Sequence, residues 1–315
     1  MNNLFPPEKA DKIAEMFSFT DEERDHFLNC ADGILQSHSK EEPEKIISAI
    51  SGYADLIAKS KGTGYTPKIS KQAIGDVQIT RIEPPCGSNT YILETPAGFL
   101  VIDSGFPSYA EELKQTVLSL YPEFPKNKTE LLITHIDMDH IGAMDLFDCV
   151  HLNATSMENF VREKTGVPNY RVKKQDRAPF YEIVVMLTKY TTPSLSNIKL
   201  LDSVKPDHSL PLSFIGELKA AGLTFSVYEG YGGHVEGSMI FLENDLGLIF
   251  TGDILINPDG FTPEQLIANR YPAVLAGGSV NEDSKKAAAE RYAAYEMMQG
   301  RRWTVCPGHG DVFQL

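Results

Sequence analysis

The stretch that decides the fold runs Leu131-Leu132-Ile133-Thr134-His135-Ile136-Asp137-Met138-Asp139-His140-Ile141-Gly142. It begins as an apolar strand and ends in four side chains of metal-ligand type, which are spaced by Ile136 and Met138. Side chains at i and i+2 of an extended loop project to the same side, so His135 and Asp137 are placed to share one ion. Asp139 and His140 then reach a neighbouring ion. Taken alone, the stretch also permits a solvated loop with chance histidines.

Three later positions favour a metal site over a solvated loop. His234 is the third residue of G-G-H-V-E-G-S, Asp253 ends I-F-T-G-D, and His309 is the fourth residue of C-P-G-H-G. Each is a ligand-type residue in a turn at a strand boundary, where glycine permits close backbone approach. The other histidines lack such surroundings, and we interpret them as surface or ordinary hydrogen-bonding residues: His26, His38, His151 and His208.

The composition is that of an ordinary globular protein, with 315 residues, 42% hydrophobic and 23% charged. The 29 Lys and Arg against 43 Asp and Glu give a net charge of -14. This charge argues against nucleic acid or an anionic membrane as a partner, because both bind basic surfaces. The N-terminus lacks the pattern of a signal peptide, and no apolar run is long enough to span a membrane, so we expect a cytoplasmic protein. The cysteines form no C-x-x-C pair and are expected to be reduced thiols: Cys30, Cys86, Cys149 and Cys306.

Residues 1–72 are expected to form a helical N-terminal extension, and residues 73–315 an α/β domain. Thr20-Asp21-Glu22-Glu23 has the spacing of a capping box, which predicts a helix from Asp21. A second apolar stripe runs from Ile46 to Ile57. Two amphipathic helices cannot bury their apolar faces alone. We therefore expect them to pack on each other and on the main domain, or on a second copy of the chain in a homodimer.

Short β-rich runs alternate with helical segments in the second region. An insert at about residues 151–212 has weaker periodicity, and within Arg162–Arg177 six basic residues face two acidic ones. Helices are expected over Tyr109–Tyr121, from Gly142, and over Ser284–Met298. Strands are expected at Val77–Glu83, Thr90–Glu94, Phe99–Ile102, Leu131–Thr134, Thr224–Tyr228, Met239–Leu242, Leu248–Phe250 and Trp303–Cys306.

The motifs, in this order and spacing, resemble the metallo-β-lactamase superfamily from about Asp76 to Leu315. The family pattern is H-x-H-x-D-H, then a G-H-x-x-G-S turn, a bridging Asp after a strand, and a final His. The resemblance implies a four-layer αββα sandwich with two metal ions at one edge. Asn89-Thr90-Tyr91 and Ile102-Asp103-Ser104-Gly105 also resemble early strand signatures of the family, in which the Asp supports the ligands.

One position departs from the family pattern, because Asp137 stands where the family usually has a second His. With a bridging hydroxide, three Asp ligands give a charge of −4 against the +4 of two divalent ions. A more neutral cluster is a weaker Lewis acid, and the added carboxylate favours iron or manganese, while two His and one carboxylate also suit zinc. The resemblance implies a first site of His135, Asp137 and His234, a second of Asp139, His140 and His309, and Asp253 as the bridge.

The resemblance also implies a reaction, since most members of the superfamily are hydrolases in which a metal-bridging hydroxide attacks a carbonyl or phosphorus. We therefore expect a dinuclear hydrolase of a small ester, lactone, thioester or phosphodiester, with Asp139 as the orienter or proton acceptor. The basic insert favours an anionic substrate. The candidate substrate contacts are Arg171, Lys173 and Tyr231, against the alternatives of a solvated helix face and a tyrosine in the core.

Two alternatives to a hydrolase stay open. The flavodiiron proteins of the same superfamily carry a carboxylate at the position of Asp137, in the form H-x-E-x-D, and bind two irons for oxygen or nitric oxide reduction. Resemblance to them implies a diiron redox or gas-sensing protein, although the sequence ends at Leu315 without a flavodoxin domain, so a separate partner is expected to deliver electrons. The other alternative is a scaffold with a purely structural metal. The expected cofactors are two divalent ions, zinc or iron, with manganese as a further option.

Overall fold

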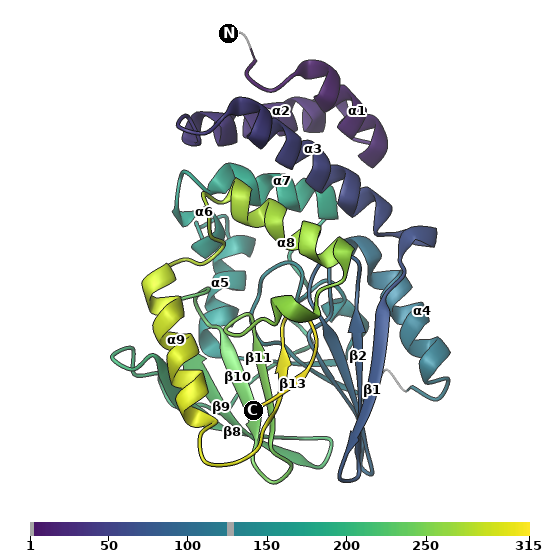
Figure 1. Ribbon diagram of the computed structural model, residues 1–315, viewed down its shortest axis with the longest axis vertical. Helices are drawn as coiled ribbons and strands as arrows, with labels where there is room; N and C mark the ends of the chain where they lie inside the picture. Colours follow the sequence, from purple (N-terminus) through teal and green to yellow (C-terminus); the bar gives the residue numbers. More distant parts are fainter. Residues whose placement is uncertain (1–2, 125–128) are drawn as a thin grey trace.

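Two β-sheets pack face to face in the computed structural model, which describes residues 3–124 and 129–315 (Figure 1). The first sheet has the order β1-β2-β3-β4-β5-β6-β7 and the second the order β13-β12-β11-β10-β9-β8. The first comprises β1 Lys68–Ile74, β2 Val77–Glu83, β3 Thr90–Thr95, β4 Gly98–Ile102, β5 Glu130–Leu132, β6 Cys149–Leu152 and β7 Ile198–Leu200. The second comprises β8 Leu212–Ala220, β9 Leu223–Gly230, β10 Met239–Glu243, β11 Leu248–Gly252, β12 Thr304–Pro307 and β13 Phe313–Gln314.

The strand pairing brings the ligand-bearing loops to one edge of the sandwich. In the first sheet β1 to β4 are antiparallel, and β4 to β7 are parallel. In the second sheet β11 and β12 are parallel neighbours. Parallel strands end at the same edge, so the loops after β4 and β5 and those after β11 and β12 lie together. Between the sheets lies a core of alternating apolar side chains, including Leu93, Leu132, Phe225, Phe241 and Phe250.

Helices cover the outer faces of both sheets. Leu113 and Val117 of α4 pack against the first sheet, and Ala294 of α9 packs against the second. The expected αββα sandwich with a helical N-terminal extension is therefore confirmed. The helices are α1 Pro7–Phe17, α2 Asp21–Ser37, α3 Pro43–Lys59, α4 Ala110–Leu120, α5 Ala154–Lys164, α6 Tyr170–Lys173, α7 Ala178–Thr188, α8 Pro263–Leu275 and α9 Ser284–Met297.

The N-terminal helices form a layer above α7 and α8 (Figure 1). The predicted capping box is present at the start of α2, where Thr20 Oγ1 accepts from the backbone N of Glu23 and Glu23 Oε2 accepts from the backbone N of Thr20. The extension packs through α2 on α7 and through α3 on α8. Its buried side chains, among them Ile34 and Ile50, are continuous with the core of the first sheet.

Three local expectations differ from the structure, each for a physical reason. β1 begins at Lys68, before the expected start of the second region, and as an exposed edge strand it lacks an apolar pattern. The helix expected from Gly142 is only a short 3₁₀ turn, Met144–Leu146. β6 begins at Cys149, so the chain between Gly142 and this strand is too short for more than one turn. The insert contains three helices that its weak periodicity did not predict, α5, α6 and α7. α6 has only four residues and α7 is apolar over most of its surface, so neither shows an alternation of polar and apolar faces.

Within the described ranges, no helix combines the length and the hydropathy that crossing a bilayer requires.

The contact between the extension and α8 is expected to be part of the stable core. Ile50 of α3 is fully buried, so Ile50→Ala should lower the free energy of unfolding by about 2–5 kcal/mol, as measured by urea denaturation. Ile69→Ala on the edge strand is the control, because Ile69 is 41% exposed and its truncation should cost less than about 0.5 kcal/mol. If both variants lowered the free energy of unfolding by the same amount, this would show that the extension unfolds separately from the α/β domain.

Candidate metal centre

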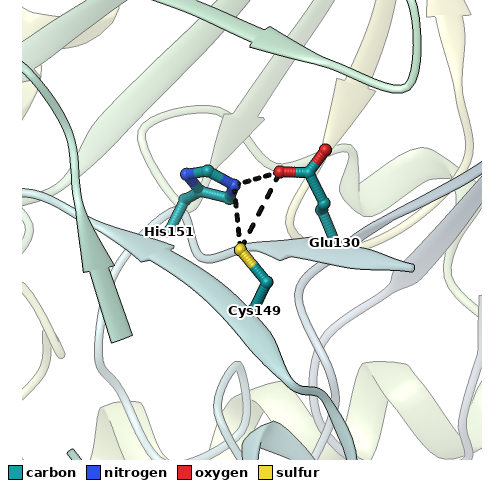
Figure 2. Close-up of side chains that lie close together, drawn as sticks. All are labelled: Glu130, Cys149 and His151. Atoms are coloured by element: carbon teal, nitrogen blue, oxygen red, sulfur yellow. Dashed lines mark hydrogen bonds and ion pairs between the residues drawn. The ribbon is translucent and has the colours of Figure 1, made fainter. Parts of the chain in front are cut away.

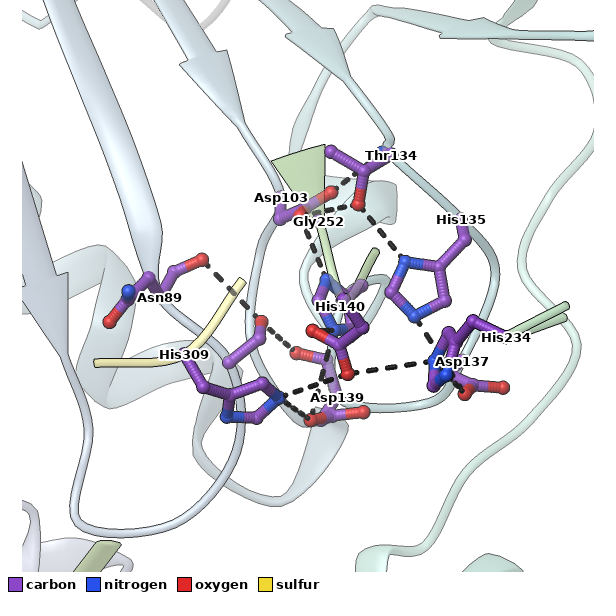
Figure 3. A network of polar contacts seen from close by, with 12 residues as sticks. Asn89, Asp103, Thr134, His135, Asp137, Asp139, His140, His234, Gly252 and His309 are labelled. Carbon is purple, nitrogen blue, oxygen red and sulfur yellow. Dashed lines mark hydrogen bonds and ion pairs between the residues drawn. The ribbon is translucent and has the colours of Figure 1, made fainter. Parts of the chain in front are cut away.

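The ligand-type side chains converge at one edge of the sandwich (Figure 3). His135 and His140 lie in the loop after β5, and His234 lies between β9 and β10. Asp253 follows β11 directly, and His309 follows β12. Gly308 is required here, because a Cβ at this position would lie 2.1 Å from Asp253 Oδ1.

The first donor group surrounds Asp137. Its Oδ2 lies 3.7 Å from His135 Nε2 and 3.4 Å from His234 Nε2. His234 Nε2 is also 3.5 Å from Asp253 Oδ2. These donors are close enough to share one ion after small adjustments, because ligands of a single divalent ion lie about 3–3.6 Å apart.

The second donor group lies on the other side of Asp253. His140 Nε2 is 3.4 Å from Asp253 Oδ1, and His309 Nε2 is 3.3 Å from Asp253 Oδ2. His309 Nε2 is also 3.4 Å from Asp139 Oδ2. The structure thus brings all seven predicted ligands together and places Asp253 between two groups, as a bridging carboxylate requires.

The donor atoms fit two divalent cations. The Nε2 atoms of His135, His140 and His234 are buried without a hydrogen-bond partner, as is Oδ1 of Asp253. Unpartnered buried polar atoms are costly, and a cation at their focus removes that cost. The donors are imidazole nitrogens and carboxylate oxygens, a set that suits zinc, iron or manganese.

The electrostatic field of the carboxylates favours positive charge at this position. Burial opposes the charged form of His234, but the nearby carboxylates of Asp137 and Asp253 outweigh burial and raise the pKa of His234 to about 9. The same balance raises the pKa of His309 to about 10, through Asp253 and Asp139. His135 differs, because burial and two neighbouring imidazoles hold its pKa well below the usual value.

An outer layer of hydrogen bonds orients the imidazoles. Asp103 accepts from His140 Nδ1 at 2.8 Å and also from the backbone N and Oγ1 of Thr134, each at 2.8 Å. The support that the resemblance implies for Asp103 is therefore present, and Asp103 adopts a left-handed φ of 57°. His234 Nδ1 donates to Asn281 Oδ1 at 2.9 Å. Sequence reasoning missed Asn281. Such partners fix the tautomer and direction of a metal-binding His.

Asp137 itself is held by the insert. Tyr170, at the start of α6, donates its hydroxyl to Asp137 Oδ1 at 2.7 Å. Asp137 Oδ2 stays directed at His135 and His234. Tyr170 is fully buried, so the hydrogen bond selects which carboxylate oxygen faces the metal position.

The predicted substrate contacts lie in three different environments. Arg171 borders the cavity above the centre, but its guanidinium binds Glu163 Oε2 at 2.6 Å and the carbonyl of Ile136. Lys173 is largely exposed and pairs with Glu236. Tyr231 lies in a separate surface depression beside Lys286. The structure places only Arg171 of the three at the cavity.

The cavity above the donors is small and has largely apolar walls. Its volume is about 110 Å³. Its floor includes Asp137, Asp139, His234, Asp253 and His309. Its walls come from segments far apart in sequence and include Tyr53 of α3, Phe180, Tyr181 and Val184 of α7, and Ala268, Asn269 and Pro272 of α8.

The model of the metallo-beta-lactamase superfamily matches residues 84–149, which contain the first ligand motif. The expected resemblance to this superfamily is confirmed. AidC, a dizinc quorum-quenching lactonase, superposes with a TM-score of 0.50 at 13% identity, over 76% of this chain and 90% of AidC. This likeness shows the metallo-β-lactamase fold.

Two further solved structures match at lower scores. The hydrolase AbOPH of the beta lactamase superfamily has a TM-score of 0.49 at 17% identity, over 77% of this chain and 90% of that chain. A flavoprotein from Thermotoga maritima has a TM-score of 0.46 at 16% identity, over 79% of this chain and 58% of that chain. A search of curated proteins finds no significant sequence match.

Loss of Asp137 is expected to remove one of two bound ions. Asp137→Ala should lower the metal content toward one ion per chain in elemental analysis, because the first group keeps only two imidazoles and Asp253. Tyr170→Phe should weaken binding by about 10–100-fold in chelator competition, since it releases the orienting hydrogen bond. Tyr231→Phe, a tyrosine outside the cavity, is the control. Full occupancy in Asp137→Ala would show that Asp137 is not a ligand.

Proposed function

We propose that this chain is a dinuclear metal-dependent hydrolase of small, uncharged carboxylic esters, lactones or thioesters. The observation that carries the proposal is the position of Asp253 at the floor of an apolar cavity, where its carboxylate contacts both donor groups. Its Oδ2 lies 3.5 Å from His234 Nε2 of the first group, and its Oδ1 lies 3.4 Å from His140 Nε2 of the second. Two divalent ions, when bound, supply a hydroxide nucleophile near neutral pH and stabilise the developing oxyanion.

The protein's own residues contribute position and proton transfer. Asp139 Oδ2 points toward His309 Nε2, and the residue borders the cavity. A carboxylate at this point orients the nucleophile and accepts its proton. Asp103 and Asn281 fix the imidazoles through their outer nitrogens, so the donor groups keep their geometry during the reaction.

The cavity favours an uncharged substrate with an apolar acyl group. Among the described residues that line it, Arg171 is the one Lys or Arg, and its charge is paired with Glu163. Four of the other five cations of the basic insert are also paired with acids of the same chain. These pairs are Arg162–Glu158, Lys173–Glu236, Lys174–Glu282 and Arg177–Glu282. Most of the local positive charge that suggested an anionic substrate is thus paired with carboxylates of the protein itself.

Hydrolysis of p-nitrophenyl acetate by the metal-loaded protein tests the proposal. Asp139→Asn, assayed at the same metal content per chain, should lower kcat/KM by about 10²–10⁴-fold, because the amide cannot accept the proton. The melting temperature should stay close to that of the unmodified protein. Asp176→Asn, an exposed acid of the insert, is the matched control. Unchanged turnover in Asp139→Asn would contradict the assigned role, and absence of turnover on esters, lactones and thioesters would contradict the hydrolase.

A diiron centre that reacts with oxygen or nitric oxide is the second candidate. The observation that favours it is Asp137, a third carboxylate held 3.4 Å from His234 Nε2, because added carboxylate suits harder ions.

Elemental analysis of protein purified without air or added metal separates the two candidates. The hydrolase predicts two zinc or manganese ions per chain and no visible absorption that changes with air. Two irons, together with a visible spectrum that responds to oxygen titration, would favour the diiron function instead.

A further inference from the structure

A second cluster of ligand-type side chains lies on two neighbouring strands away from the metal centre (Figure 2). Glu130 is the first residue of β5 and pairs in register with Cys149, the first residue of β6. Since side chains alternate along a strand, Cys149 and His151 project from the same face of β6. Glu130 meets them from β5. The cluster therefore lies at the opposite end of β5 from the loop that carries His135.

The three side chains direct three different donor atoms at one point. Glu130 Oε2 is 2.5 Å from His151 Nε2. Cys149 Sγ is 3.5 Å from His151 Nε2 and 3.9 Å from Glu130 Oε2. Sulfur, nitrogen and oxygen ligands of one tetrahedral zinc lie at about 2.0–2.3 Å from the ion and hence about 3.4–3.6 Å from one another. The two sulfur separations are already close to these values.

Only the carboxylate has to move for an ion to enter. The separation of Glu130 from His151 must widen by about 1 Å to reach the tetrahedral value. The Glu130 side chain is 30% exposed, so it is free to adjust and leaves room for a water ligand. The side chain of His151 is fully buried, so the surrounding residues hold its imidazole in place. A thiolate and a carboxylate balance the charge of a divalent ion, which suits this half-buried position.

A catalytic role for the thiol fits the cluster less well than metal binding. Burial and the nearby Glu130 raise the pKa of Cys149, whereas a nucleophilic cysteine needs a lowered pKa. Burial also lowers the pKa of His151, so the imidazole is neutral, which is its metal-binding form. A metal ion displaces the thiol proton on binding, so the raised pKa does not prevent coordination.

We propose that Glu130, Cys149 and His151 form a third metal site, which takes one divalent ion of the zinc class with water as the fourth ligand. Thiolate and imidazole together select zinc or cobalt over magnesium and calcium. A bound ion cross-links β5 to β6. The site shares no residue with the dinuclear centre, so the proposal does not depend on the hydrolase function.

Cobalt titration of the metal-stripped full chain tests the third site. The dinuclear donors contain no sulfur, so a thiolate-to-cobalt charge-transfer band in the near ultraviolet reports a cysteine ligand. We expect this band in the unmodified protein and its loss in Cys149→Ser, which should bind one ion fewer per chain and keep its ester hydrolysis. Cys30→Ser is the matched control and should keep the band. It is a stringent control because Cys30, like Cys149, lies beside an imidazole, with its Sγ 3.8 Å from His26 Nε2.

A second variant keeps the test decisive if Cys149→Ser folds poorly. Glu130→Gln retains the thiol and replaces a partly exposed side chain, and it should weaken cobalt binding at this site at least about tenfold while the band persists at saturation. Absence of the band in the unmodified protein, its loss in Cys30→Ser, or unchanged cobalt affinity in Glu130→Gln would each overturn the third site.

Discussion

The carboxylate of Asp253 faces imidazoles from both sheets, with Oδ1 near His140 of the first sheet and Oδ2 near His234 and His309 of the second. These contacts exist only when the two sheets pack with their strand ends aligned. The apolar core between the sheets therefore does more than stabilise the fold, because its packing sets the spacing of the donor groups. Removing side chains from that core should disturb the metal centre before any ligand is changed.

The sequence predicts much of this arrangement because the signals are local. Each ligand lies in a short motif at the end of an apolar run, and β2 has the predicted bounds, Val77–Glu83. The edge strand β1 has no such signal, since its side chains are mostly exposed. The role of Asn281 could not be predicted from the sequence either. It contacts His234 across 47 positions of the chain, and the neighbouring sequence does not identify it as a partner.

Strand register and long-range ion pairs account for the other differences. His151 looks ordinary in sequence, since Glu130 becomes its neighbour only through the β5–β6 pairing. The sequence of the basic insert likewise shows its net local charge, but it does not show which acidic residues pair with its cations. Glu236 and Glu282 lie far along the chain and neutralise Lys173, Lys174 and Arg177. A charge count therefore overestimated the field available to a substrate.

Different elements of the fold form the floor and the walls of the cavity. Its floor is made of strand-end loops that carry the ligands, whereas its walls come from α3, α7 and α8. Wall residues such as Tyr53 and Val184 contribute shape and do not bind the donor groups. Substitutions in these helices can thus change the shape of the cavity while the donor groups at its floor are preserved. The helical extension therefore has a part in the selectivity of the cavity through Tyr53 of α3, although it carries none of the seven donor residues.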